Sequence, residues 1–268
     1  MSTKKRIIKY VIKTKVDKIS MEEALSKIIK WAINKETKYV SITNTDVVIR
    51  SWLNKRLREI INSSDLSTPD GAPISLILRL QGCKNQRRVT GPDLMENLIF
   101  EAHKKKLKLF FYGSTQNVLS LIEKRIKNLY PDSYVYFKSP PFRKLTEIEE
   151  EEVIANINSI NPDIVFVGLG CPKQDIWIKD KKNKINSVFI SVGAAFDFYA
   201  NTVQRAPNFM RNNGLEWLHR LYKEPLRLYK RYLVILFLFW FGISAQLISF
   251  LGKHFFKSLR FLLEKIYK

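Results

Sequence analysis

The chain has 268 residues, and its 46 Lys and Arg residues against 25 Asp and Glu give it a formal net charge of +21. Because 46% of the residues are hydrophobic, the chain can bury a full core, which excludes a disordered protein and allows one large domain or a domain with an appendage. Two cysteines and three scattered histidines form neither a disulfide framework nor a metal-ligand pattern, which indicates a reducing compartment.

The excess positive charge fits a phosphate-bearing substrate, an anionic membrane surface, nucleic acid, or a basic background composition on solvated helix faces. Nucleic acid is the least favoured of these partners, because aromatic residues for base stacking are not interleaved with the basic ones. Basic residues also interrupt every apolar run near the amino terminus. We therefore expect no signal-peptide core there and a chain whose bulk stays in the cytoplasm.

Strands and helices are predicted to alternate along the chain. The predicted strands lie near residues 6–16, 38–42, 65–71, 107–114, 134–137, 164–167 and 187–192. The predicted helices lie near residues 21–32, 47–61, 72–80, 92–103 and 118–129, with further helices after Thr146 and Pro172. Capping boxes precede the first helix at Ser20 and the acidic helix at Thr146. This alternation predicts an α/β fold, Rossmann-like, with a mainly parallel sheet and helices on both faces.

The stretch from Asp163 to Asp175, DIVFVGLGCPKQD, joins a buried strand to a helix through a glycine turn. Gly168 and Gly170 allow a sharp turn, and Pro172 suits the first position of the helix. We expect free amides in this turn and the positive end of the helix dipole to favour a phosphate or another anion. The alternative is an ordinary structural turn, since glycines after strands are common.

Polar residues follow several predicted strands at the same edge of the sheet: Asn44, Asp70 and the Gly168 to Gln174 loop, joined by Asp197. Each also has a plain structural explanation. Asp70 stands in Pro-Asp-Gly, which suits a surface turn, and Asp197 suits a cap or a buried hydrogen-bonded carboxylate. The sequence contains no Asp-x-Asp pair, so a diphosphate here is expected to rely on Arg, Lys and helix N-termini instead of a metal clamp.

Eight sequence blocks between about Val11 and Tyr232 closely resemble the WecG/TagA/CpsF family of bacterial glycosyltransferases. The blocks are ITNTDVV, LSTPDGAPI, RVTGPDLM, LFFYGS, PPFRKLT, VFVGLGCPKQD, ISVGAAFDFYANTVQRAP and GLEWLHRLYKEPLRLYKRY. The resemblance implies an inverting, metal-independent enzyme without a cofactor. It would transfer N-acetylmannosamine or its uronate from a UDP-sugar to a polyprenyl-diphosphate-linked sugar, in teichoic acid or surface polysaccharide synthesis.

The resemblance also implies site residues. Asp70 falls on the general base, a role in which a tuned carboxylate contributes about 10² to 10⁴ in rate. The implied substrate-binding residues are Thr43, Asn44, Gly71, Arg88, Gly168, Gln174, Asp197, Arg220, Arg227, Lys230 and Arg231. The chain departs from the family at Ile42, where Thr is frequent, so that hydroxyl role passes to Thr43 or Thr45 or is lost. Asn201 stands where Gly is frequent, a mild change because Asn tolerates left-handed backbone.

We divide the chain into an α/β core (1–207), a basic appendage over the active site (208–231) and a membrane-associating tail (232–268). The tail begins with 20 uncharged residues from Tyr232 to Leu251, enough to span a bilayer. Its basic flanks and central Trp240 favour embedding from the cytoplasmic side, with a single span and a buried oligomer contact as alternatives. Beyond it, the stripe of Lys253, Lys257, Arg260, Glu264 and Lys268 is typical of a helix lying in the interface.

The sequence thus predicts a glycosyltransferase at the cytoplasmic face of the bacterial inner membrane. Its expected partners are the UDP-sugar, the polyprenyl-diphosphate-linked acceptor and the anionic membrane surface, and a homo-oligomer is considered with them. The alternative hypothesis is a non-catalytic α/β nucleotide-binding module anchored at the membrane surface.

Overall fold

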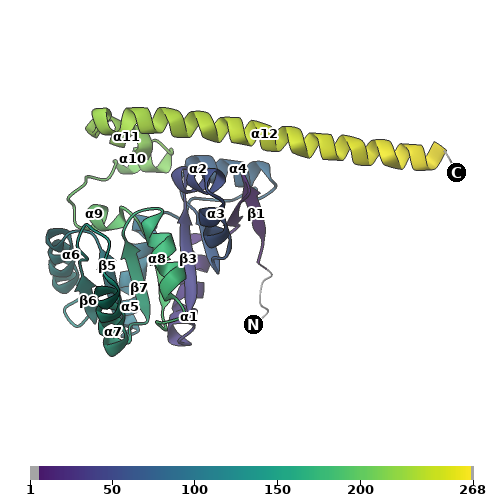
Figure 1. Cartoon of the computed structure of the whole chain (residues 1–268). Helices are drawn as coiled ribbons and strands as arrows, with labels where there is room; N and C mark the ends of the chain where they lie inside the picture. Colours follow the sequence, from purple (N-terminus) through teal and green to yellow (C-terminus); the bar gives the residue numbers. More distant parts are fainter. Residues whose placement is uncertain (1–5, 267–268) are drawn as a thin grey trace.

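A single six-stranded parallel sheet organises the protein (Figure 1). In the computed structural model, which describes residues 6–266 and the side chains of 6–211 and 213–250, neighbouring strands are all parallel. The strand order is β4 (Leu66–Pro69), β3 (Lys38–Thr43), β8 (Val188–Ser191), β7 (Ile164–Gly168), β5 (Leu109–Gly113) and β6 (Val135–Lys138). The predicted α/β, Rossmann-like class is therefore confirmed.

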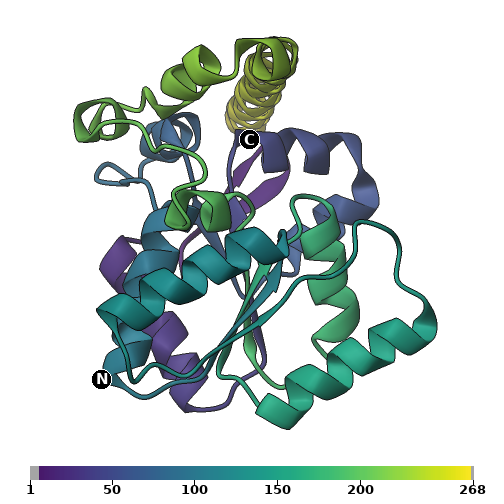
Figure 2. The ribbon, with the colours of Figure 1, turned by 90° about the vertical axis from the view of Figure 1, so that its left-hand side faces the viewer.

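Helices cover both faces of the sheet (Figure 2). Alternate strand residues pack on α1 (Met21–Ile33), α5 (Gly91–Lys104), α6 (Gln116–Leu129) and α9 (Ala195–Tyr199) on one face. The intervening residues pack on α3 (Lys55–Asn62), α7 (Glu147–Ile160) and α8 (Lys173–Lys181) on the other. Because side chains alternate along a strand, the continuous apolar runs read from the sequence supply both of these cores.

Both predicted capping boxes are present. The Ser20 hydroxyl accepts the amide of Glu23, whose carboxylate accepts the Ser20 amide at 3.1 Å. Thr146 and Glu149 make the same reciprocal pair at the start of α7. Local side chains thus fix where these two helices begin.

Three predicted elements differ from the structure. The opening strand is an antiparallel hairpin, β1 (Ile8–Val11) and β2 (Thr14–Asp17), which forms a separate sheet. The single helix predicted over 47–61 is two helices, α2 (Thr45–Leu53) and α3, because Asn54 adopts an extended backbone and caps α3 by accepting the amide of Leu57. Helix α8 begins at Lys173, so Pro172 precedes the helix instead of opening it.

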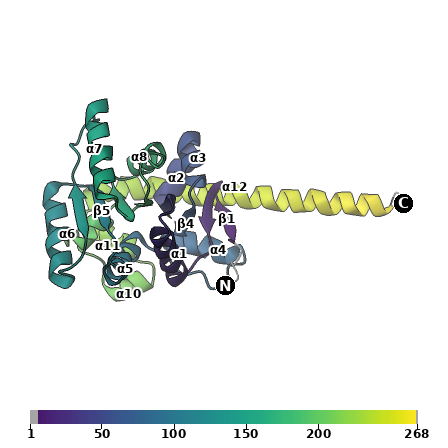
Figure 3. The same cartoon turned by 90° about the horizontal axis from the view of Figure 1, so that it is seen from below.

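The residues after Pro207 form α10 (Asn208–Asn212), α11 (Glu216–Lys223) and α12 (Pro225–Ile266) (Figure 1). Helix α12 runs along α2 and extends beyond the core, as seen from below in Figure 3. It continues without a break through residue 232, where the sequence suggested a boundary. The stripe predicted from Lys253 to Lys268 lies outside the described side chains.

Part of α12 completes a core of its own with the hairpin, α2 and α4 (Ala72–Leu80). Phe239 is fully buried there, and Gly242 lies so close to Ile12 that an added Cβ would meet its side chain at 2.7 Å. The Gln246 side chain accepts the Ile12 amide at 2.7 Å and donates to the Tyr10 carbonyl at 2.9 Å. This polar residue of the apolar tail therefore binds the free backbone of the hairpin.

Candidate active site at the strand ends

The predicted polar residues do meet at one edge of the sheet. Strands β4, β3, β8 and β7 are consecutive neighbours, and they lead respectively to Asp70, Asn44, Gly193 and the loop after Gly168. Since all of these strands are parallel, their carboxyl ends lie along the same edge. The appendage helices α10 and α11 pack above this edge (Figure 1).

Asp70 occupies a partly buried position immediately after β4, held by neighbours on β3. Its backbone amide donates to the Thr43 carbonyl at 3.0 Å, and its carboxyl group is hydrogen-bonded by the Asn44 side chain. Asn44 also caps α2 by accepting the Val47 amide at 3.1 Å. Gly71 follows with a φ of +91°, a left-handed value that favours glycine, and so starts α4 directly after the carboxylate.

The electrostatic surroundings of Asp70 suit a proton acceptor. Burial, followed by the charge of Glu216, raises the pKa of Asp70 from 3.8 to about 7, although Arg88 and the Asn44 hydrogen bond act in the opposite direction. A carboxyl group with a pKa near the working pH combines a useful ionised fraction with real basicity. The position can therefore act as a general base.

Arg88 lies between Asp70 and the appendage. Its guanidinium is 3.6 Å from the Glu216 carboxylate and donates to the Arg211 carbonyl, so two appendage elements are attached to it. Glu216 is 4.0 Å from Arg205 as well. The sequence analysis predicted no role for Glu216. Its position could have indicated one, because Glu216 and Glu224 are the only acidic residues of the basic segment 208–231.

Thr43 reaches the site only through its backbone. Its side chain is fully buried, and its hydroxyl lies 2.7 Å from the Ser67 hydroxyl and 3.2 Å from that of Ser41. This hydroxyl cluster joins β3 to β4 inside the sheet. Thr43 therefore positions Asp70 through its carbonyl and presents no exposed hydroxyl at the edge.

Gln174 binds two loops together at this edge. It is buried, and its Oε1 accepts the amide of Gly170 at 3.1 Å and the amide of Gly193 at 3.0 Å. The expectation of free amides in the turn after β7 is therefore wrong at Gly170, because a side chain of the same protein already accepts its amide. Gly168 is required by packing, since an added Cβ would lie 2.6 Å from the Phe196 ring.

The predicted basic residues of the tail divide into groups. Arg220 and Arg227 act on Asp197, whose pKa is raised by burial and lowered by these two charges, with a net increase. Arg231 instead forms an ion pair of 2.8 Å with Asp46 in the first turn of α2, and Lys230 is exposed. Of the four, two therefore face the carboxylate that follows β8.

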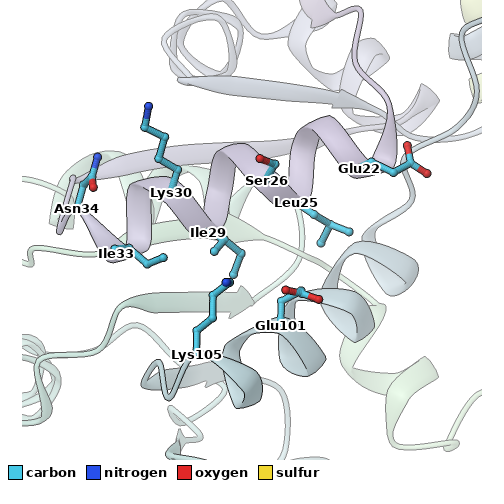
Figure 4. Close-up of a pocket in the computed structure, with 9 residues that line it drawn as sticks. All are labelled: Glu22, Leu25, Ser26, Ile29, Lys30, Ile33, Asn34, Glu101 and Lys105. Atoms are coloured by element: carbon cyan, nitrogen blue, oxygen red, sulfur yellow. The ribbon is translucent and has the colours of Figure 1, made fainter. Parts of the chain in front are cut away.

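One cavity lies away from this edge of the sheet. It has a volume of about 520 Å³ and lies between α1 and α5, where Leu25 and Ile29 point toward α5 and Lys105 points toward Ile29 (Figure 4). It contains none of the predicted site residues. Within the described residues, no three His, Cys, Asp or Glu side chains are grouped so that they could hold a metal ion.

These observations define an α/β protein whose titratable and basic groups gather at the carboxyl ends of parallel strands beneath a helical appendage. Residues 9–252 match the model of the glycosyl transferase WecG/TagA/CpsF family. The chain belongs to this family of glycosyltransferases.

Two curated relatives bear the same name, N-acetylglucosaminyldiphosphoundecaprenol N-acetyl-beta-D-mannosaminyltransferase. The protein of Bacillus spizizenii is 31% identical over 190 residues, which cover 70% of this chain and 72% of the relative. The protein of Bacillus subtilis is 30% identical over 198 residues, covering 73% of this chain and 75% of the relative. The resemblance inferred from the sequence blocks is confirmed.

Proposed function

We propose that this glycosyltransferase moves N-acetylmannosamine or its uronate, with inversion, from a UDP-sugar to a polyprenyl-diphosphate-linked sugar. The observation that carries the proposal is the environment of Asp70, whose pKa of about 7 suits a general base at a strand end. The names of the two Bacillus relatives support both the N-acetylmannosaminyl group and the lipid diphosphate acceptor.

In the proposed reaction an acceptor hydroxyl attacks the anomeric carbon of the donor sugar. A new carbon–oxygen bond forms as the bond from that carbon to the UDP oxygen breaks, and the hydroxyl proton passes to Asp70. Negative charge grows on the departing diphosphate. Arg220 and Arg227, which face Asp197, are the residues that we expect to balance it.

The substitution Asp70→Asn tests the base, because it keeps the shape of the side chain and removes its basicity. We expect the rate of transfer to fall by about 10² to 10⁴ while the dissociation constant of UDP stays the same. Asp132→Asn, the same change at an exposed position, serves as the control. Unchanged turnover in Asp70→Asn would refute the assignment of the base.

The donor is identified by incubating the wild-type enzyme with a panel of UDP-sugars and a short-chain prenyl-diphosphate glycoside, with mass-spectrometric detection of the product. We expect transfer from UDP-N-acetylmannosamine or its uronate. A protein that binds UDP and transfers none of the sugars would instead favour the non-catalytic nucleotide-binding module.

We further propose that α12 rests in the cytoplasmic leaflet of the membrane. Over Pro225–Phe250 this helix is long and apolar enough to cross a bilayer. One side of it packs on the protein through Phe239 and Gln246, whereas the outer side exposes large apolar residues. The exposed set includes Leu233, Val234, Phe237, Phe241, Leu247, Ile248 and Phe250. A contiguous apolar face of this kind needs an apolar environment.

The contacts of Gln246 with the hairpin favour a helix that lies along the membrane over one that crosses it, since they hold the helix against the core. Protease protection of a C-terminal tag in inverted and right-side-out vesicles tests the orientation. We expect the tag to be cleaved only where the cytoplasmic face is exposed. Cleavage from the opposite face would establish a span.

A further inference from the structure

A second cavity, of about 430 Å³, lies between the core and the appendage. Helices α5, α6, α9 and α10 and the segment before α10 surround it. Three arginines line it: Arg125, Arg205 and Arg211. Phe198 and Tyr199 of α9 form part of its wall, while the preceding residue, Asp197, is influenced by Arg220 and Arg227.

Together with Arg88, the three guanidinium groups make four positive charges that share three carboxylates. Arg125 pairs with Glu96 at 3.1 Å, and both Arg205 and Arg211 approach Asp93, at 2.7 Å and 3.7 Å. The third carboxylate, Glu216, is 4.0 Å from Arg205 and is shared with Arg88. The cavity therefore keeps an excess of positive charge.

Two donors of this cluster are buried without an acceptor among the described residues, the Nε atoms of Arg205 and Arg211. A buried N–H group of this kind is normally satisfied by a protein group, a water molecule or a ligand. The N–H donors of a guanidinium group match the oxygen geometry of phosphate groups, and several converging arginine side chains are typical of phosphate recognition. The cavity thus has the chemistry of a site for a phosphate or a diphosphate.

The position of the cavity distinguishes the two diphosphates of the proposed reaction. It adjoins the strand-end site without including Asp70, since Arg88 donates to the Arg211 carbonyl and contacts Glu216. In a lipid-linked acceptor the diphosphate is one sugar ring away from the hydroxyl that Asp70 would deprotonate. Next to Arg211, Phe209 of α10 is 72% exposed, which offers an apolar surface for a prenyl chain.

We propose that this cavity binds the diphosphate group of the polyprenyl-diphosphate-linked acceptor. The assignment rests on the proposed function. It gives the acceptor and the donor separate arginine sets, with Arg125, Arg205 and Arg211 for the acceptor and Arg220 and Arg227 for the donor.

Two substitutions with opposite expected effects on the acceptor KM test the assignment. Arg125→Gln removes one positive charge, and we expect it to raise the KM for a short-chain prenyl-diphosphate glycoside about tenfold without changing the dissociation constant of UDP. Glu96→Gln removes the carboxylate that lines the cavity and should lower the same KM. Lys124→Gln, an equal loss of charge at an exposed position of the same helix, should change neither.

Calorimetry with inorganic diphosphate measures the same site without turnover. We expect binding to weaken in Arg125→Gln and to strengthen in Glu96→Gln, each with the melting temperature recorded to establish folding. An unchanged acceptor KM in folded Arg125→Gln overturns the assignment. A loss of UDP affinity in the same variant also overturns it, because the cavity would then bind the donor. A wild-type enzyme that transfers no sugar overturns the proposed function and the acceptor assignment together.

Discussion

Asp70→Asn should slow transfer by about 10² to 10⁴ and, at the same time, make the protein more stable above neutral pH. In the folded protein burial, followed by the charge of Glu216, raises the pKa of Asp70 to about 7, against an ordinary value of 3.8. The fold therefore favours the protonated carboxyl. As the pH rises from about 4 to 7 the unfolded chain releases this proton first, so the wild-type protein loses stability across that interval.

The size of the effect follows from the same pKa. Each pH unit of difference corresponds to about 1.4 kcal/mol, so the ionised carboxylate costs the fold on the order of 4 kcal/mol at pH 8. Asparagine carries no charge at any pH. Since it does not reproduce the protonated carboxyl completely, we expect a gain of about 2 to 4 kcal/mol at pH 8, or roughly 4 to 7 °C in Tm for a chain of this length.

Thermal unfolding of both proteins between pH 5 and pH 8.5 measures this gain. The difference in Tm should grow with pH up to about 7 and then level off, while Asp132→Asn should show no such dependence. A difference that does not vary with pH, or a less stable Asp70→Asn at pH 8, would refute the raised pKa of Asp70. The proposed base would then lose the feature that makes it basic at neutral pH.

Three further outcomes are expected. Glu216→Gln removes a charge that raises the pKa of Asp70, so the acid limb of the pH–rate profile should move to lower pH, and an unmoved limb would contradict the influence of Glu216 on Asp70. Gln174→Ala leaves two partly buried amides without their acceptor and should lower the free energy of unfolding by about 1 to 3 kcal/mol, as chemical denaturation can measure. Lys173→Ala, at an exposed position, should not lower it. Truncation before Tyr232 should move the protein from the membrane to the soluble fraction. Phe237→Lys in the full-length chain keeps the contacts of Gln246 and should also weaken membrane association. Continued membrane association of both variants would contradict the role of α12.

The sequence predicted the order of the elements well where the signals are local. The continuous apolar runs of β5, β7 and β8 and the capping boxes at Ser20 and Thr146 depend on neighbouring residues alone, and the structure has each of them in place. The single helix expected over 47–61 was wrong because its apolar periodicity continues through Asn54, whose side chain instead caps a new helix. A periodic apolar pattern does not show which residue within it adopts a non-helical backbone and divides the stretch into two helices.

What the sequence determined by itself is the set of polar residues at strand ends, because strand, turn and parallel topology together place Asn44, Asp70 and Asp197 at one edge. Only the tertiary structure decided which groups meet there. Several of these contacts join residues far apart in the chain. They are the ion pair of Arg88 with Glu216, the hydrogen bond between Gln174 and the Gly193 amide, and the hydrogen bonds of Gln246 with the hairpin. Such contacts, and the pKa values that follow from them, depend on distances through space that no local pattern specifies.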